Sequence, residues 1–306
     1  MKKKSTFLTI VVLAALLSPL CRADAGEIEP RSYGNAPVGV NFLIVGYAHS
    51  KGGLSMSDAS PLKDPNLKMD SALVAYARTL DMWGTPGKID VILPVSDLSG
   101  TASVGGQPKE RKISGLLDPR LRLSTIFYGA PVLTVQEFPG WQQDLLIGAS
   151  IQVSPPLGQY DPDKLVNLGN NRWFVKPEIG ISKAWGDLTL ELLTGVMLFS
   201  DNNDYYGGKK LEQNPLSTSQ AHLLYNFSKG IWAAISGSYD YGGRTKTNGV
   251  RGDDQQSNSR IGATMALPLS RNHSVKLYAS TAVHTTRGNE YDLLGIAWQY
   301  RWGGGL

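Results

Sequence analysis

The stretch from Trp173 to Trp185, WFVKPEIGISKAW, alternates between two kinds of side chain with a period of two. In an extended strand one face would carry Trp173, Val175, Pro177, Ile179, Ile181 and Trp185, and the other Phe174, Lys176, Glu178, Gly180, Ser182 and Ala184. Such a strand, tilted by about 45°, covers roughly 28 Å along a membrane normal. This length matches the apolar band of about 25 Å, edged by aromatic residues, of an outer-membrane barrel. The stretch is therefore typical of one strand of a membrane barrel.

Residues 1–25 predict a cleaved secretory signal peptide. The chain begins MKKK, continues with an apolar run over residues 7–17, and reaches a small-x-small site at Ala23-Asp24-Ala25. The apolar run is too short for a spanning helix, which needs about 20 residues. The bulky Leu20 before Cys21 argues against lipid attachment at that cysteine. Cleavage after Ala25 would remove the one cysteine of the chain, so disulfides cannot hold the mature protein together.

The formal charge of +4 carries little information about partners. The signal peptide holds four basic residues and one acidic residue, so the mature chain has a net charge of +1. No glycine-rich phosphate loop, dinucleotide motif or basic-aromatic nucleic-acid surface is present. We therefore expect no nucleic-acid partner and no cofactor.

Alternating stretches recur through the rest of the chain, with polar or glycine-rich segments between them. They are residues 41–49, 67–79, 89–95, 117–127, 145–153, 173–185, 188–198, 220–227, 231–241, 260–267, 275–284 and 294–302. Most connections alternate between long and short, as in outer-membrane barrels. The pattern predicts an all-β protein: a transmembrane antiparallel β-barrel of about 12 strands over residues 38–306, after a periplasmic N-terminal tail at 26–37. Pro94, Pro119 and Pro177 fall within strands, and each should mark a bulge or a strand end.

Charged residues on the predicted inner faces are the candidates for a functional site. They are Arg78, Asp118, Arg120, Arg122, Lys176, Glu178, Glu191, Arg260, Lys276 and Arg301, with Asp70 and Asp90 beside them. They would either line a water-filled path and select solutes by charge, or pair with one another and fill a narrow barrel. Asp118, Arg120 and Arg122 are the first choice for mutation.

Aromatic residues at strand ends predict two girdles at the membrane interfaces. They are Trp173, Trp185, Tyr239, Tyr241, Trp298, Tyr300 and Trp302.

Evidence for catalysis or metal binding is weak. The histidines lack metal-ligand spacing, and the run Asp201–Asp204 lacks the spacing of a calcium loop. Two Ser/His pairs, Ser219 with His222 and Ser280 with His284, are conceivable in a lipid-modifying barrel, although the alternation gives neither pair a shared lipid-facing site. We expect no enzyme activity and no metal site.

Several blocks together resemble the transporter family of the meta-pathway of phenol degradation. They are ILP (92–94), SGLLDP (114–119), PPLGQYD (155–161), NLGNNRW (167–173), FSDNNDYYGG (199–208) and WQYRW (298–302). The resemblance covers nearly the whole mature chain, and the blocks from Pro155 to Trp173 are its most specific part. It implies an outer-membrane β-barrel that passes aromatic or other hydrophobic compounds. One departure from outer-membrane barrels in general is the end of the chain, where GGGL follows Trp302.

These observations predict a passive channel for small aromatic or hydrophobic solutes in the outer membrane of a Gram-negative bacterium. The partners would be outer-membrane lipid and the solute, and the sequence leaves the oligomeric state open. Two alternatives remain: a surface-interaction barrel with a plugged lumen, and a lipid-modifying barrel enzyme.

Overall fold

A computed structural model describes residues 28–55, 62–104 and 106–306. The strands are β1 Val40–Ser55, β2 Leu62–Met82, β3 Thr85–Val104, β4 Gln107–Leu116, β5 Arg120–Tyr128, β6 Leu145–Ser154, β7 Phe174–Trp185, β8 Leu188–Phe199, β9 Asn202–Tyr205, β10 Lys209–Gln213, β11 Leu216–Asn226, β12 Trp232–Gly242, β13 Thr245–Thr247, β14 Val250–Arg251, β15 Gln256–Pro268, β16 His273–Thr285 and β17 Gly288–Gly303. Two short 3₁₀ helices, η1 Phe138–Gly140 and η2 Ser228–Gly230, lie in connections. No helix in these described ranges is both long and apolar enough to span a membrane.

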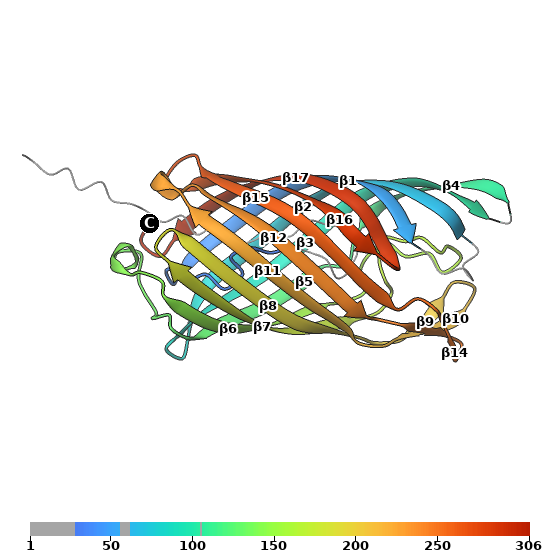
Figure 1. Cartoon of the computed structure of the whole chain (residues 1–306), viewed down its shortest axis with the longest axis horizontal. Helices are drawn as coiled ribbons and strands as arrows, with labels where there is room; N and C mark the ends of the chain where they lie inside the picture. Colours follow the sequence, from blue (N-terminus) through green and yellow to red (C-terminus); the bar gives the residue numbers. More distant parts are fainter. Residues whose placement is uncertain (1–27, 56–61, 105) are drawn as a thin grey trace, which may run out of the picture.

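The long strands form one closed antiparallel barrel (Figure 1). Its order is β2-β1-β17-β16-β15-β12-β11-β8-β7-β6-β5-β3, and β2 pairs with β3 to close the circle. The main sheet has 13 strands, and β4 is the one outside the circle, because it pairs only with the outer part of β3. The predicted transmembrane antiparallel barrel of about 12 strands is confirmed.

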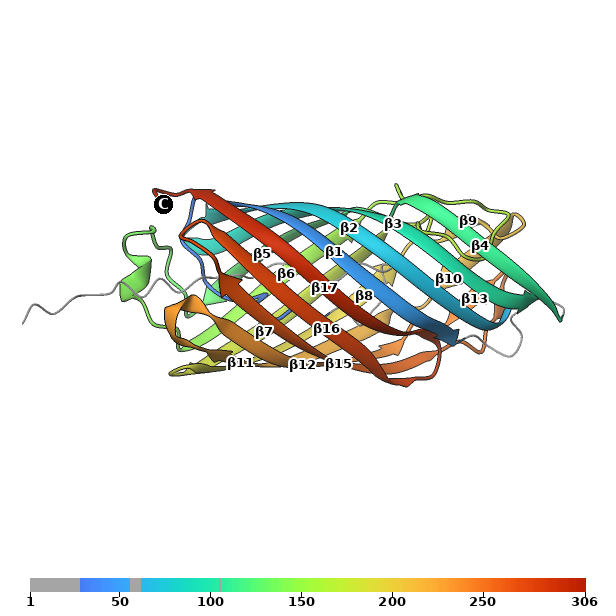
Figure 2. The same cartoon turned by 90° about the horizontal axis from the view of Figure 1, so that it is seen from above.

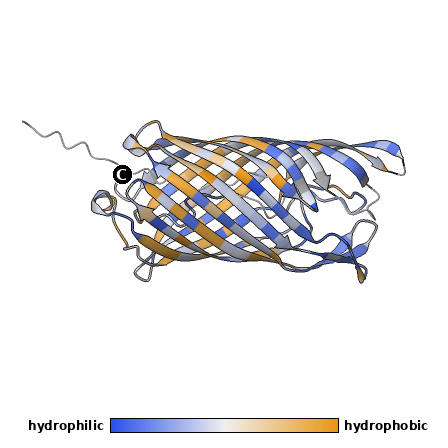
Figure 3. Ribbon diagram, viewed as in Figure 1, coloured by the Kyte–Doolittle hydropathy of each residue, from blue (hydrophilic) through white to orange (hydrophobic). Residues whose placement is uncertain are grey.

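The two ends of the barrel differ in their connections. One end, here called the turn end, carries the chain terminus at Leu306 and short links such as Trp185–Leu188. The other, the loop end, carries β9, β10, β13 and β14, which form a small separate sheet (Figures 1 and 2). All barrel strands are strongly tilted to the long axis, as closure of a barrel requires. Apolar residues gather on the half towards the turn end, and hydrophilic residues on the loop end (Figure 3).

Two of the three prolines mark irregular points of the barrel wall. Pro119 lies between the end of β4 and the start of β5, and Pro94 lies opposite this break on β3. The β7–β8 ladder passes from the pair Val175↔Leu198 directly to Glu178↔Gly195, so Pro177 has no partner on β8. Pro119 and Pro177 thus lie beside a strand end and at an irregular point of a ladder, as predicted, because proline has no N–H to donate. Pro94 lies inside β3 in regular register with Leu73 of β2, so the prediction of a bulge or strand end is wrong there.

The predicted inward and outward faces are correct for most strands but inverted for β2. In β2, Leu73, Ala75 and Ala77 are buried inside the barrel, whereas Arg78 is exposed on the outer face and Asp70 lies on the same face. The prediction that Arg78 faces the lumen is therefore wrong. The reason is that β2 has apolar residues on both faces. The prediction therefore depended on the few charged residues of 67–79, which lie on the outer face.

Candidate functional site

The first described residues of the chain lie inside the barrel. Residues 28–35, here called the lumen segment, reach inward-facing side chains of several strands. The Glu29 N–H donates to Gln220 Oε1 of β11 at 3.0 Å, and the Arg31 N–H donates to Glu191 Oε2 of β8 at 2.7 Å. Residues 26–37 were expected to form a periplasmic tail, and for the described part that expectation is wrong. The partners lie 160 residues or more along the chain, beyond the reach of local pattern.

Arg122 of β5 is the centre of the charged contacts. It is buried and pairs with Glu29 of the lumen segment through Nη1, while its Nε lies 3.2 Å from Asp90 Oδ2 on β3. Arg122 and Asp90 are direct cross-strand partners, which explains why both side chains point to the same place. A buried cation between two carboxylates satisfies the rule that interior charges are paired.

A second charged group extends over β7 and β8. Lys176 Nζ lies 2.9 Å from Glu178 Oε2, and both residues belong to the inward face of β7. Glu191, on β8, accepts a hydrogen bond from Ser182 at 3.1 Å and another from the lumen segment. Arg31 also donates to Asn226 and lies with its guanidinium 4.6 Å from the Trp232 ring centroid. The buried charged residues on the inner faces of β3, β5, β7 and β8 are here called the charged wall. They are Asp90 of β3, Arg120 and Arg122 of β5, Lys176 and Glu178 of β7, and Glu191 of β8.

The remaining predicted charges do not join this group. Asp118 accepts hydrogen bonds from the N–H groups of Gly158 and Asn170, both at 2.8 Å, and so holds the long β6–β7 loop against the barrel. Arg301 donates from Nε and Nη2 to the carbonyl of Arg271, in the turn between β15 and β16. These two residues act as anchors of connections rather than as parts of one site.

Two further cations lie on the inner face away from the charged wall. Arg260 donates to Ser280 Oγ and to the Tyr291 carbonyl and lies 4.1 Å from the Tyr291 ring centroid. Lys276 is buried, with Nζ 5.8 Å from the Tyr278 ring centroid. The predicted set thus divides into one cluster, separate cations and loop anchors, with Arg78 outside.

Another region of the inner face is apolar, and it meets the charged wall at β3. A cluster of buried side chains, here called the apolar wall, lines β1, β2, β16, β17 and one position of β3. Its members are Val40, Phe42, Ile44, Ala48, Leu73, Ala75, Ala77, Ile92, Tyr278, Leu293 and Ala297. In the closed strand order β1 and β17 lie half the circumference from β8 and β7. A period-two pattern cannot reveal this wall, because β1 and β2 are apolar both inside and outside.

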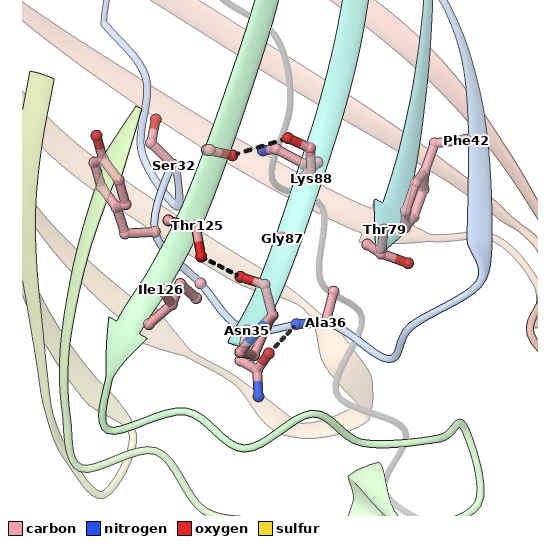
Figure 4. Close-up of a pocket in the computed structure, with 13 residues that line it drawn as sticks. Ser32, Asn35, Ala36, Phe42, Thr79, Gly87, Lys88, Thr125 and Ile126 are labelled. Atoms are coloured by element: carbon pink, nitrogen blue, oxygen red, sulfur yellow. Dashed lines mark hydrogen bonds between the residues drawn. The ribbon is translucent and has the colours of Figure 1, made fainter. Parts of the chain in front are cut away.

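A small cavity of about 30 Å³ lies between the lumen segment and the barrel wall towards the turn end (Figure 4). It is lined by Ser32 and Asn35 of the segment and by Thr79, Lys88 and Thr125 of the wall, among others. Its volume suits one or two water molecules. The lumen segment is therefore close-packed against the barrel here.

The predicted aromatic girdle residues lie on outward faces near the strand ends. Trp173, Tyr239 and Tyr241 are about half exposed towards the loop end, and Trp185 is equally exposed at the turn end. On β17, Tyr300 lies between Trp298 and Trp302, at centroid distances of 6.3 and 5.4 Å.

Neither of the two Ser/His pairs considered above forms. Ser219 is exposed on the outer face, whereas His222 is fully buried inside and its Nδ1 lies 2.8 Å from Ser236 Oγ. Ser280 accepts a hydrogen bond from Arg260 instead of contacting His284. In the described ranges no group of three or more His, Cys, Asp or Glu residues could hold a metal ion.

Comparison of the sequence with known protein families identifies the family of this chain. The sequence model described as "Putative MetA-pathway of phenol degradation" matches residues 55–300. The chain belongs to this family. The matched region includes every barrel strand from β2 onward, almost to the end of β17. No curated protein sequence matches the chain.

Among solved structures, this chain resembles an outer-membrane channel of Pseudomonas putida F1 with a TM-score of 0.75. The identity is 20%, and the match covers 89% of this chain and 99% of that one. The β domain of the Bordetella autotransporter BrkA matches with a TM-score of 0.50 and 8% identity, covering 86% of this chain and all of that domain. At these identities the likeness shows the fold, an outer-membrane type of barrel.

Proposed function

We propose that this protein is a passive channel for small aromatic or hydrophobic solutes in the outer membrane of a Gram-negative bacterium. The barrel fold and the family membership support a membrane channel. The outward apolar faces with aromatic residues at their ends support a position in lipid.

The observation that carries the choice of solute is the apolar wall. Barrel interiors of porins are polar, because they hold water. Here eleven buried residues form an apolar cluster along one side of the lumen, including Phe42, Ile44 and Leu73. A solute that enters between these packed side chains would gain roughly 25 cal/mol per Å² of its apolar area removed from water. A solute with an apolar body would therefore pass more readily than an ion or a sugar.

The lumen segment favours a second candidate, a barrel that is closed and has another role at the surface. The segment is held by contacts from Glu29, Arg31 and Tyr33 to four or more strands. For a channel, this segment must restrict the path, so solutes either pass beside it or displace it.

Deletion of residues 28–35 separates the two candidates. We expect the purified variant in planar bilayers to show a conductance several-fold above that of the wild type. Proteoliposomes should also take up an aromatic solute such as 4-methylphenol faster, because the segment no longer restricts the path. Heat-modifiable migration on gels checks that the barrel is folded. If neither the wild type nor the folded variant passes ions or aromatic solutes, the channel is wrong and the closed barrel is favoured.

A further inference from the structure

The phenol side chain of Tyr33, in the lumen segment, packs closely against the inner wall of the barrel. The site that it occupies there, formed by Gly148, Ser150, Glu178 and Gly180, is here called the seat. Tyr33 is only 2% exposed, although it belongs to a segment outside the β-sheet. The hydroxyl donates to Glu178 Oε1 at 3.2 Å and lies 3.1 Å from Ser150 Oγ. The Glu178 carbonyl oxygen, at 3.4 Å, is a weaker third contact. The ring and the hydroxyl are thus both accommodated by the wall.

The seat consists of two neighbouring cross-strand pairs on β6 and β7. Gly148 pairs with Gly180, and two residues further along the same inward face Ser150 pairs with Glu178. A Cβ atom on Gly148 would lie 2.5 Å from Tyr33 Cδ1, and one on Gly180 would lie 2.1 Å from Cδ2. Because real atoms do not approach so closely, only glycine at these two positions leaves room for the ring.

The hydroxyl end of the seat is polar and buried. Glu178 uses Oε2 for Lys176 and Oε1 for the phenol, so its carboxylate has a fixed orientation. Hydrogen bonds from a hydroxyl to an ionised carboxylate are stronger than neutral ones. Removal of the phenol would leave polar groups in a confined space without their partner, which costs free energy.

From this geometry we propose that Gly148, Gly180, Ser150 and Glu178 form a binding site for a hydroxylated aromatic solute, which Tyr33 occupies as an internal competitor. The Tyr33 side chain is itself a 4-alkylphenol, so a solute of this class can make the same contacts. Tethering gives Tyr33 a high effective concentration at the seat, in the millimolar range for short flexible links. A solute therefore competes with Tyr33 and, on binding, detaches one of the anchors of the lumen segment.

This proposal rests on the proposed channel for its physiological meaning, but its test measures binding and needs no transport. Purified protein in detergent is titrated with 4-methylphenol, and binding is followed by calorimetry. In Tyr33→Ala the seat is vacant while Glu29 and Arg31 still hold the segment. We expect this variant to bind 4-methylphenol about ten-fold more tightly than the wild type, because one buried hydrogen-bonded group no longer competes.

Two double variants make the test specific. Tyr33→Ala with Gly180→Ala should return binding to the wild-type level, because the new methyl group fills the seat. Tyr33→Ala with Gly237→Ala should keep the tight binding, since a Cβ on Gly237 meets nothing closer than 3.9 Å. Toluene, which has the ring without the hydroxyl, should bind the vacant seat at least several-fold more weakly than 4-methylphenol.

The proposal is overturned if Tyr33→Ala binds 4-methylphenol no better than the wild type. It is also overturned if toluene binds equally well, or if Gly180→Ala and Gly237→Ala have the same effect. Intact binding without any solute flux in liposomes would overturn the channel instead, and normal flux without binding would overturn the site alone.

Discussion

The charged wall and the apolar wall of the same lumen differ in how they are held together. On the charged wall, Arg122 and Glu191 are buried with partners on neighbouring strands and on the lumen segment, and Lys176 pairs with Glu178 of its own strand. On the apolar wall, Ile44 and Leu73 are buried by packing alone. Contacts of the charged wall are directional and few, whereas those of the apolar wall are numerous and interchangeable.

The comparison teaches that an inward face is recognisable in sequence only when it contrasts with lipid. On β7 and β8 the charged inner residues alternate with apolar outer ones, and the predicted orientation is correct. On β2 both faces are apolar near Leu73, and the prediction placed Arg78 on the wrong side. The apolar wall, which carries the proposed choice of solute, is thus the part that alternation hides.

The largest expected effect comes from breaking the charged wall at Arg122. Arg122→Ala leaves Asp90 buried without its ion-pair partner and removes one partner from Glu29. Loss of one member of a buried ion-pair group typically costs about 3–5 kcal/mol. Urea unfolding in detergent micelles should show that the free energy of unfolding decreases by this amount in Arg122→Ala. The decrease should be smaller in Arg122→Lys, which keeps the positive charge. A decrease below about 1 kcal/mol would mean that these charges are not buried as described.

A polar side chain on the apolar wall should have a smaller effect on stability and a selective effect on transport. Ile44 is fully buried, and Ile44→Asn places an amide there, at a cost of about 1–3 kcal/mol if it lacks partners. We expect uptake of 4-methylphenol by proteoliposomes to fall several-fold while the ion conductance does not fall. Ile44→Val, which keeps the wall apolar, is the control. An equal loss of both fluxes would show that the wall is structural and does not select the solute.

The smallest effect is expected outside the barrel, at Arg78. Because this side chain is exposed on the outer face of β2, Arg78→Ala should change the free energy of unfolding by no more than about 0.5 kcal/mol. Conductance should also match the wild type. If Arg78→Ala alters ion selectivity, the side chain faces the lumen and the described orientation of β2 is wrong.

The alternation of apolar and polar residues along the sequence was sufficient to predict the barrel and the inward direction of much of the charged wall. Arg120, Arg122, Lys176, Glu178 and Glu191 are each flanked by apolar residues at odd spacing, which identified their inward direction. What pattern could not supply is which charges meet, since Asp118 anchors a loop while Arg122 pairs across strands. That outcome depends on strand register and on loops that return to the barrel.

The lumen segment is the largest feature that the sequence analysis did not predict. Glu29, Arg31 and Tyr33 alternate in a tail rich in glycine and proline, and this regular spacing of two charges and an aromatic ring was the available signal. Its meaning needs the wall, because Tyr33 fits only where Gly148 and Gly180 lie side by side on β6 and β7. A single sequence does not state that two glycines 32 positions apart are neighbours.

By itself the sequence predicted an export signal at residues 1–25, which lies outside the described residues. It also determined that the chain forms a membrane barrel and roughly how many strands close it. These properties follow from periodicity, because the pleat of a strand imposes a period of two and the bilayer sets its length. Only the tertiary structure decided that the lumen has one charged and one apolar wall and that the chain's own Tyr33 occupies a seat in it. Both depend on contacts between residues far apart in the chain, which closure of the barrel and register bring together.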